Sequence, residues 1–277
     1  MSDLSIVIPT LGRRSVYFSA CLDSIFELIN TALQVGLTTE LIIVCPESRH
    51  GFVRCLLAGR RATLFSDPGS GPAGAINVGL RAASSPLVMW IGDDDVLRPT
   101  GVLNSVLSLK SQENAVFTFG NCWLIGETGE PLSLARPGFW ALPMLRFGPD
   151  RIPQPGSVLR RSALATAGFL DEALGYAFDL DLFLRLLSLG GGIRQREVVA
   201  HFRIHPGSLT VSNPAPQAEA QVVRRKYSSP LEQRFQFLTW PVAKFAVRLV
   251  DRYQWRISPK HRFDGRLTPI GPSKDEA

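Results

Sequence analysis

Residues 86–95 read PLVMWIGDDD, an apolar run that ends abruptly in three adjacent aspartates. The run is typical of a buried strand, which would place the aspartates at the carboxyl edge of a sheet. Adjacent carboxylates repel one another unless a cation holds them together, and hard oxygen ligands suit Mg2+ or Mn2+. The alternative is a solvated acidic turn before the helix that Pro99-Thr100 begins.

Similar apolar runs alternate with helical patterns along the first half of the chain. This order predicts an α/β fold with a doubly wound, mostly parallel sheet and helices on both faces. Ligands of such sheets bind outside the carboxyl ends of the strands, so Pro9-Thr10, Cys45-Pro46 and the aspartates would share one cleft. We expect strands at 4–9, 40–45, 62–65, 86–91 and 115–119, and helices beginning at Ser15, Pro72 and Thr100.

The second half of the chain has weaker patterns. Residues 126–155 are rich in Gly and Pro, which predicts loops with short irregular strands. Residues 212–220, with Pro214 and Pro216, are typical of a linker. The remaining elements that we expect are helices at 164–168 and 178–189, a strand at 198–204, and an amphipathic helix after residue 230 that bends at Pro241.

Composition limits the class of protein. The 277 residues are 45% apolar and 19% charged, which is ordinary for a soluble, well-cored domain. Residues 221–277 hold twelve Lys and Arg against five Asp and Glu, so the net charge of +6 belongs to the tail. A nucleic-acid enzyme would carry basic charge around its cleft, so we expect no nucleic-acid partner.

The four cysteines, Cys21, Cys45, Cys55 and Cys122, form no CxxC pair. They read as buried thiols in a reducing compartment and argue against zinc. No secretory signal and no membrane-spanning run are recognisable, so we expect a cytoplasmic protein.

Five motifs, in order along the chain, resemble the glycosyltransferase family 2 enzymes, although GxGxxG and P-loop fingerprints are absent. The first is SIVIPTLGR at 5–13, which resembles the family's opening strand. The others are 71–79, before the metal strand; 91–99, the metal-binding segment; 168–172 with 178–185, on the acceptor side; and 202–208, which closes the domain. The resemblance covers roughly residues 3–212 and implies a GT-A-type fold.

The resemblance implies an inverting, metal-dependent transfer of a sugar from a nucleoside-diphosphate sugar to a hydroxyl of a glycan or lipid-linked acceptor. A divalent cation, Mg2+ or Mn2+, would stabilise the leaving diphosphate. By resemblance its ligands are Asp93, Asp95 and His205, although the family pattern leaves open which two of Asp93, Asp94 and Asp95 bind the metal. The residues expected to contact the nucleotide sugar are Pro9, Thr10, Gly12, Arg13, Glu47, Asp67, Asn77, Asp93 and Asp94.

By the same resemblance, Asp179 is the base that deprotonates the acceptor hydroxyl. The sequence departs from the family here, because Phe178 stands where the family usually has glutamate. An apolar neighbour would raise the pKa of Asp179 by desolvation, and Asp181 would raise it by repulsion. The alternative is that Asp179 and Asp181 are solvent-side charges favoured by a helix N-terminus.

These inferences divide the chain into a catalytic domain at 1–212, with a nucleotide-sugar half to about residue 100 and an acceptor half at 101–212. A linker and basic amphipathic tail at 213–263 would follow, and 264–277 would be disordered. The tail helix suits either the inner face of the cell membrane or a second subunit in a homodimer. Two other functions are a non-catalytic nucleotide-sugar-binding module and a sugar nucleotidyltransferase; the first loop lacks the glycine-rich triphosphate site that the latter needs.

Overall fold

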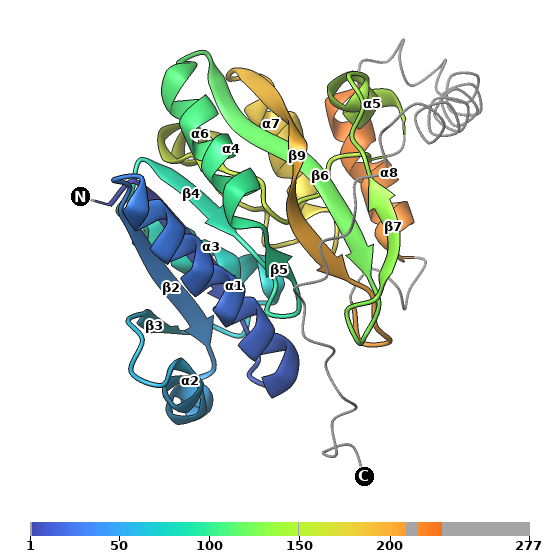
Figure 1. Cartoon of the computed structure of the whole chain (residues 1–277). Helices are drawn as coiled ribbons and strands as arrows, with labels where there is room; N and C mark the ends of the chain where they lie inside the picture. Colours follow the sequence, from blue (N-terminus) through green and yellow to red (C-terminus); the bar gives the residue numbers. More distant parts are fainter. Residues whose placement is uncertain (1, 149, 209–214, 229–277) are drawn as a thin grey trace.

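The computed structural model describes residues 2–148, 150–208 and 215–228. These residues form one sheet in the strand order β3-β2-β1-β4-β8-β6-β9-β5, with β7 beside β6 (Figure 1). The strands are β1 Leu4–Pro9, β2 Thr39–Cys45, β3 Thr63–Ser66, β4 Leu87–Trp90, β5 Val96–Leu97, β6 Ala115–Ile125, β7 Pro131–Ala135, β8 Leu159–Arg160 and β9 Gly191–Arg203.

The two halves of the sheet differ in direction. Strands β3, β2, β1 and β4 all run parallel, so their carboxyl ends meet at one edge. In the other half, β8 runs antiparallel to both β4 and β6, and β5 runs antiparallel to β9. Only β6 and β9 pair in parallel there. The predicted α/β fold with a parallel core is confirmed, and the second half of the sheet is mixed rather than parallel.

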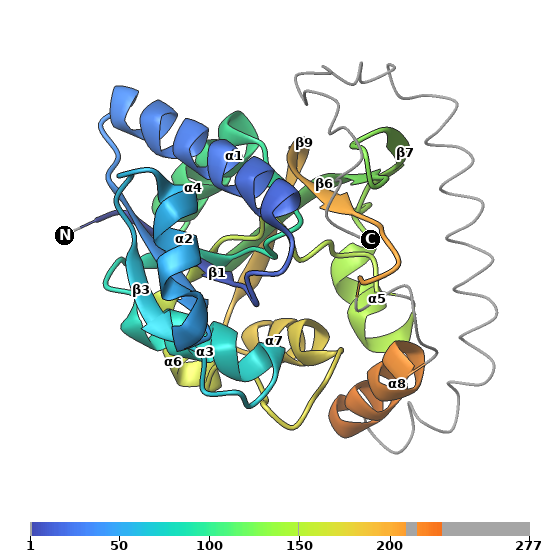
Figure 2. The ribbon, with the colours of Figure 1, turned by 90° about the horizontal axis from the view of Figure 1, so that it is seen from below.

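Helices cover both faces of the sheet, as the view from below shows (Figure 2). One layer holds α1 Ser15–Gln34, α2 His50–Leu57 and α4 Pro99–Ser111. The opposite layer holds α3 Pro72–Ala82, α6 Arg161–Ala167 and α7 Phe178–Leu186. Two further helices, α5 Ala141–Phe147 and α8 Ala215–Tyr227, lie beside α7.

Alternating side chains of β1 explain how the sheet holds both layers. Leu4, Ile6 and Ile8 pack into the cluster under α1, whereas Val7 points to the cluster under α3. Each such fully buried aliphatic side chain contributes about 2 kcal/mol. Gly79 lets α3 approach this strand closely, because a Cβ at that position would collide with Val7.

Among the described residues, α1 is the one helix long and apolar enough to cross a membrane by length and composition alone. Its apolar side, which includes Phe18, Leu22 and Ile25, is fully buried against the sheet. Those contacts are what a core helix of a folded domain makes.

Several sequence-based expectations differ from the structure. Helix α5 lies within 126–155, where only loops and short strands were expected, and Cys55 is exposed rather than buried. Helix α2, preceded by the short 3-10 turn η1 Glu47–Arg49, was not expected, because only Val53 and Leu57 of its eight residues are buried. Strands β6 and β9 are longer than predicted, running to Ile125 and beginning at Gly191. Residues 215–220, predicted as linker, begin α8, since a proline such as Pro216 is tolerated in the first turn of a helix. The predicted tail helix and the predicted disorder at 264–277 lie outside the described residues.

Candidate active site

The loop after β1 is tied to the acidic loop after β4. The Thr10 backbone N–H donates to the Val44 carbonyl over 2.9 Å, and the Thr10 hydroxyl donates to the Asp93 carboxylate. The same hydroxyl oxygen accepts the Gly12 N–H at 2.9 Å, in a turn where Gly12 takes the left-handed φ of 64° that favours glycine. The strand ends therefore meet as predicted, and Thr10 fixes one of the three aspartates.

Asp95 turns inward, away from the other two aspartates. Its residue is 3% exposed, and its Oδ1 accepts the backbone N–H of Arg203 at 2.9 Å. Arg203 is itself fully buried and donates from Nε to the Asp94 carbonyl at 2.9 Å. Its Nη1 donates to the carbonyls of Gly126 and Glu127. This network holds the acidic loop onto β9. The Asp95 carboxylate therefore points into the protein and not to the solvent-exposed side of the loop.

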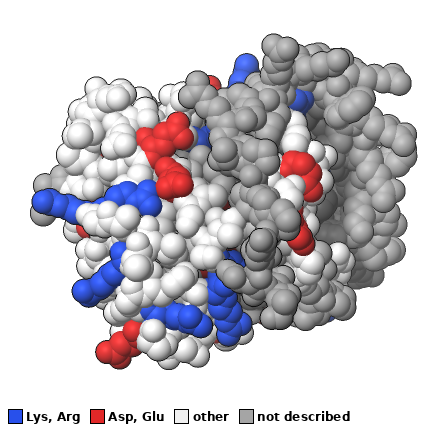
Figure 3. Space-filling view, turned by 60° about the horizontal axis from the view of Figure 1, so that its bottom comes forward, with Lys and Arg blue, Asp and Glu red and all other residues white. Residues whose placement is uncertain are grey.

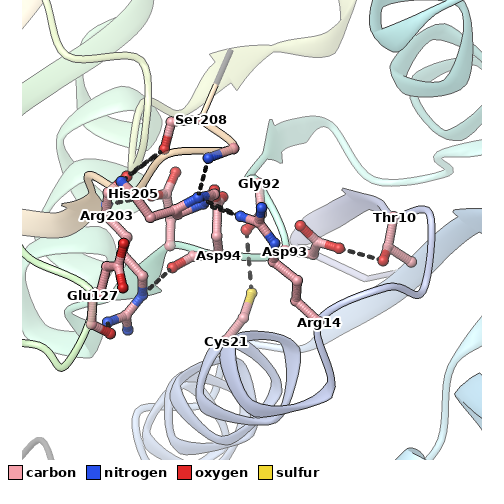
Figure 4. Close-up of polar contacts among 12 residues, drawn as sticks. Thr10, Arg14, Cys21, Gly92, Asp93, Asp94, Glu127, Arg203, His205 and Ser208 are labelled. Atoms are coloured by element: carbon pink, nitrogen blue, oxygen red, sulfur yellow. Dashed lines mark hydrogen bonds and ion pairs between the residues drawn. The ribbon is translucent and has the colours of Figure 1, made fainter. Parts of the chain in front are cut away.

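Asp94 lies against His205 and Arg14 (Figure 4). The Gly207 N–H donates to His205 Nδ1 at 3.1 Å, so a neutral ring carries its proton on Nε2 and donates it to Asp94 Oδ2 over 2.7 Å. The Arg14 guanidinium lies along the same ring edge, with Nη1 2.7 Å from Nε2. Arg14, Asp94 and His205 thus meet at one point of the sheet edge, although they are far apart in the sequence.

Burial and the charge of Asp94 raise the pKa values of the two aspartates beside it. Burial, and to a lesser degree repulsion from Asp94, raises the pKa of Asp93 to about 6 against the opposing effects of Thr10 and Arg14. Burial and the Asp94 charge likewise raise the pKa of Asp95 well above its usual value. A turn with this much buried negative charge favours a bound cation.

A divalent metal fits the open side of this turn. The described residues hold no ready cluster of three or more His, Cys, Asp or Glu ligands. None is needed, because Mg2+ is usually held by one or two carboxylates while substrate phosphates and water supply the other ligands. Asp93 and Asp94 are half-buried and keep access to solvent. Of the predicted ligands Asp93, Asp95 and His205, Asp95 is buried and accepts the Arg203 backbone N–H, whereas Asp93 and Asp94 reach the solvent.

Two other predicted contacts lie at the neighbouring strand ends. Glu47 is exposed in the turn after β2, and Asp67 is half-buried directly after β3. Asp67 Oδ1 accepts the Gly69 N–H at 2.8 Å, so this carboxylate also shapes its own turn. Pro9 ends β1 and is half-buried. Arg13 is exposed, and the arginine that lies beside the aspartates is Arg14 instead.

Asn77 does not have the position predicted for a nucleotide contact. It is fully buried, and its amide oxygen accepts the Leu170 N–H at 3.0 Å. Its amide nitrogen donates to the Leu170 carbonyl at 2.9 Å and to Glu172 Oε1 at 2.8 Å. Both donor hydrogens are therefore used within the protein, and Asn77 braces α3 against the loop before α7.

Asp179 lies in the first turn of α7 and is half-buried. Burial raises its pKa to about 7, with repulsion from Asp150 next and a smaller effect from Glu219. Desolvation thus acts in the predicted direction. The charged neighbours are different ones, since the repulsion comes from Asp150 and Glu219 rather than from Asp181.

Asp181 instead holds helices together. Its side chain is 1% exposed and forms an ion pair with Arg185, with Oδ2 2.6 Å from Nη2. Its Oδ1 accepts from the Tyr227 hydroxyl at 2.7 Å and from Lys226 Nζ at 3.3 Å. Burial alone would raise the pKa of Asp181, but these donors outweigh burial and lower it.

Four residues around the site were not singled out from the sequence: Arg14, Arg203, Asp150 and Glu219. Arg14 lies next to the predicted Arg13, and Arg203 lies inside the motif 202–208, whereas Asp150 and Glu219 belong to no motif; the role of all four depends on partners distant in the sequence. On the face shown in Figure 3, Lys and Arg side chains of the described residues occur in small groups among uncharged surface. That distribution differs from the continuous basic stripe of a nucleic-acid interface.

Comparison with known proteins gives one family. The family described as "Glycosyl transferase family 2" matches residues 5–164, more than half of the chain. An uncharacterized glycosyltransferase of Rickettsia typhi is 23% identical over 199 residues, covering 66% of this chain and 61% of that relative. The chain therefore spans less than two thirds of that relative's length.

Solved structures show the same fold at low sequence identity. Residues 1–349 of S. aureus TarS, in complex with UDP-GlcNAc, superpose with a TM-score of 0.59 at 14% identity, covering 80% of this chain and 65% of that one. The mannosyltransferase PcManGT of Pyrobaculum calidifontis, in complex with GDP-Man and Mn2+, superposes with a TM-score of 0.59 at 16% identity, covering 93% and 76%.

Proposed function

The chain belongs to glycosyl transferase family 2, and from that premise we propose that it moves a sugar from a nucleoside-diphosphate sugar to an acceptor hydroxyl, with inversion at the anomeric carbon. The acceptor would be a glycan or a lipid-linked glycan. One observation carries the proposal: two solvent-accessible carboxylates, Asp93 and Asp94, stand beside Arg14 and His205 at the carboxyl edge of the parallel strands.

The donor half would bind and activate the nucleotide sugar. Asp93 and Asp94 are the residues that would hold Mg2+ or Mn2+, which when bound offsets the charge of the departing diphosphate. His205 would join them only by giving up the Nε2 proton that it donates to Asp94. Arg14 adds a permanent positive charge at the same place, and guanidinium groups suit phosphate oxygens. Glu47 and Asp67 stand at the ends of β2 and β3, where they can accept hydrogen bonds from a base or a ribose.

The acceptor half would supply the base. Asp179 accepts the proton of the acceptor hydroxyl while the hydroxyl oxygen bonds to the anomeric carbon. The bond from that carbon to the diphosphate oxygen breaks on the opposite side, and the electron pair leaves with the diphosphate. A carboxyl whose pKa is about 7 is a stronger base than an ordinary aspartate and is still half ionised near neutral pH.

Phe178 fits this role for Asp179. It takes the place of the family's usual glutamate and is packed against the second core cluster. An apolar neighbour at this position would favour the burial that raises the pKa of Asp179. The departure from the family pattern thus supports the base rather than removing it.

A nucleotide screen tests the proposal. The thermal midpoint of the protein would be measured with UDP, GDP and dTDP, each with and without Mn2+, because a ligand that binds only the folded state raises it. We expect one nucleotide to give a clear rise that needs Mn2+. No rise with any nucleotide would contradict the proposal.

A turnover assay then distinguishes the enzyme from the alternative, a non-catalytic binding module. UDP-GlcNAc and GDP-mannose are the first donors to test, because solved structures of the same fold hold them. Release of the nucleoside diphosphate, slow with water as acceptor, is the expected result. Saturable nucleotide binding without any release would favour the binding module.

A further inference from the structure

One carboxylate of α8 closes the turn that begins α7. Glu219 Oε1 accepts the Gly175 N–H at 2.9 Å, and Oε2 accepts the N–H groups of Tyr176 and Ala177, both at 2.6 Å. The helix α7 begins at Phe178, and its cap position, Ala177, has no side-chain cap of its own. Glu219 therefore satisfies the N–H of the cap position and ties down the two residues before it, from a separate helix about forty residues further along the chain.

A second polar contact joins the same two helices further along α7. Asp181 accepts from the Tyr227 hydroxyl at 2.7 Å and from Lys226 Nζ at 3.3 Å, and its residue is fully buried. Between the two contacts, Val223 of α8 is 2% exposed and packs in the second core cluster. Asp179 lies in sequence between the capped turn and Asp181, so α8 holds α7 on both sides of it.

Helix α8 is also fixed to the other neighbour of α7. Arg224, 3% exposed, donates from Nε to the Leu145 carbonyl of α5 over 3.1 Å. Figure 2 shows α5, α7 and α8 packed beside one another on one side of the sheet. Helix α8 is thus part of the packed domain and is held in place independently of the cap it provides.

We propose that Glu219 is a positioning residue: its carboxylate fixes the turn that leads into α7, residues 175–177, and thereby aims Asp179 at the acceptor hydroxyl. The inference rests on the proposed function of Asp179 as the base. It makes α8, which lies beyond residues 5–164 of the family match, a required part of the acceptor site. Small displacements matter here, because a misplacement of about 1 Å can lower a rate by about 100-fold.

Glu219 also acts on Asp179 through its charge. The charged groups that act on Asp179 are Asp150, in the loop between α5 and β8, and Glu219 on α8, with Arg224 acting on Asp150. On α7 itself, Asp181 is paired with Arg185 and Lys226. Glu219 and Asp150 both raise the pKa of Asp179. Removing the Glu219 charge therefore shifts the acidic limb of the pH–rate profile to lower pH, an effect that lost packing alone would not produce.

Glu219→Ala, Glu219→Gln and the exposed control Gln221→Ala on the same helix test the inference. Amide hydrogen exchange of residues 175–180, nucleoside-diphosphate affinity with Mn2+, and kcat for the donor found active would be measured on each. For Glu219→Ala we expect exchange at 175–177 to rise about 10-fold, consistent with loss of a cap. Its kcat should fall about 10- to 100-fold, with nucleotide affinity unchanged.

The glutamine variant separates position from charge. Its amide oxygen can still accept one or two of the N–H groups, so kcat and exchange should lie between those of the wild type and Glu219→Ala. Its pH–rate profile should still shift to lower pH, because the charge is gone. Gln221→Ala should behave as the wild type in every assay.

Two outcomes would overturn the inference: a folded Glu219→Ala or Glu219→Gln protein with unchanged exchange at 175–177, or one with wild-type kcat and pH profile. Failure of the proposed function would look different. In that case Asp179→Asn would keep full turnover, while hydrogen exchange would still report whether Glu219 caps α7.

Discussion

The proposed donor half and the proposed acceptor half of this domain are built in different ways. In the proposed donor half, β1, β2, β3 and β4 run parallel, and the candidate site lies in the loops that directly follow them. In the proposed acceptor half the strands are mixed, and Asp179, the proposed base, lies on a helix whose surroundings come from a loop and from α8. The candidate binding site is thus encoded by short local segments, whereas the environment of Asp179 depends on residues distant in the sequence.

Charge is handled differently in the two halves as well. In the proposed donor half, the charges of Asp93 and Asp94 are offset by Arg14 and Arg203, and His205 donates a hydrogen bond to Asp94. In the acceptor half, Asp179 is next to other carboxylates, and its pKa is raised to about 7. The first arrangement suits binding of a cation and phosphates, and the second suits proton transfer.

The largest expected effect separates turnover from binding. Asp179→Asn should lower turnover by roughly 100- to 10,000-fold, the range that a general base contributes, while leaving Mn2+-dependent nucleotide affinity unchanged. Single-turnover assays and calorimetric titration with the nucleotide check the two halves of this statement.

The matched control is Glu197→Gln, an exposed residue of β9 for which no change is expected. Normal turnover in Asp179→Asn would show that another group is the base.

The pH dependence of the wild-type rate tests the same role. The rate should rise about 10-fold per pH unit up to about pH 7 and then level off, because only the ionised form of Asp179 accepts a proton.

Asp94→Asn should impair both metal-dependent nucleotide binding and turnover. It removes a charge that faces the donor site, so we expect the effect of Mn2+ on nucleotide affinity to disappear and turnover to fall by roughly 100- to 1,000-fold. Asp23→Asn, on the outer surface of α1, is the control and should bind nucleotide normally. If nucleotide affinity still depended on Mn2+ in Asp94→Asn, the metal would have to bind at another site.

Adjacent arginines offer a sharper comparison within the donor half. Arg14→Ala should lower turnover by roughly 10- to 100-fold, because a charge-assisted contact contributes about 1.5–3 kcal/mol. Arg13→Ala should have little effect, since Arg13 is exposed and Arg14 is the arginine that lies against His205. Kinetics with saturating donor distinguish the two variants, and the reverse order of effects would contradict the placement of Arg14.

The smallest expected effect on the reaction is that of Asn77, which holds α3 against the loop before α7. Asn77→Ala should lower the free energy of unfolding by about 2–3 kcal/mol and the melting temperature by roughly 4–10 °C, because it leaves buried partners at Leu170 unsatisfied. Nucleotide affinity in the folded variant should change less than about 2-fold. A large loss of nucleotide affinity without a loss of stability would show that Asn77 contacts the nucleotide, as the sequence predicted.

The sequence predicted the donor half closely because its signals are local. Apolar runs ending in Pro9-Thr10, Cys45-Pro46 and the aspartates fall at strand ends, and parallel strands bring such ends together. What it could not decide was which aspartate faces inward. That choice depends on the Arg203 backbone N–H, more than a hundred residues away, which holds Asp95.

The acceptor half was predicted in outline only. Helix α7 was predicted from its pattern, and Asp179 was singled out by the family resemblance, but the helix at 215–227 was hidden by two prolines that are typical of linkers. The partners of Asp179 and Asp181 also could not be read, because Asp150, Glu219 and Tyr227 belong to no motif. Their effect exists only once the helices have packed.

The position of a bound metal tests the account most directly. Crystals grown with Mn2+ and with UDP or GDP would be measured at the manganese absorption edge, and the anomalous difference density would locate the ion. The account predicts a single strong peak against the Asp94 carboxylate, near Asp93 and His205, with Asp95 still bound to the Arg203 backbone. A peak ligated by Asp95, or a bound nucleotide whose diphosphate lies away from this edge, would contradict it.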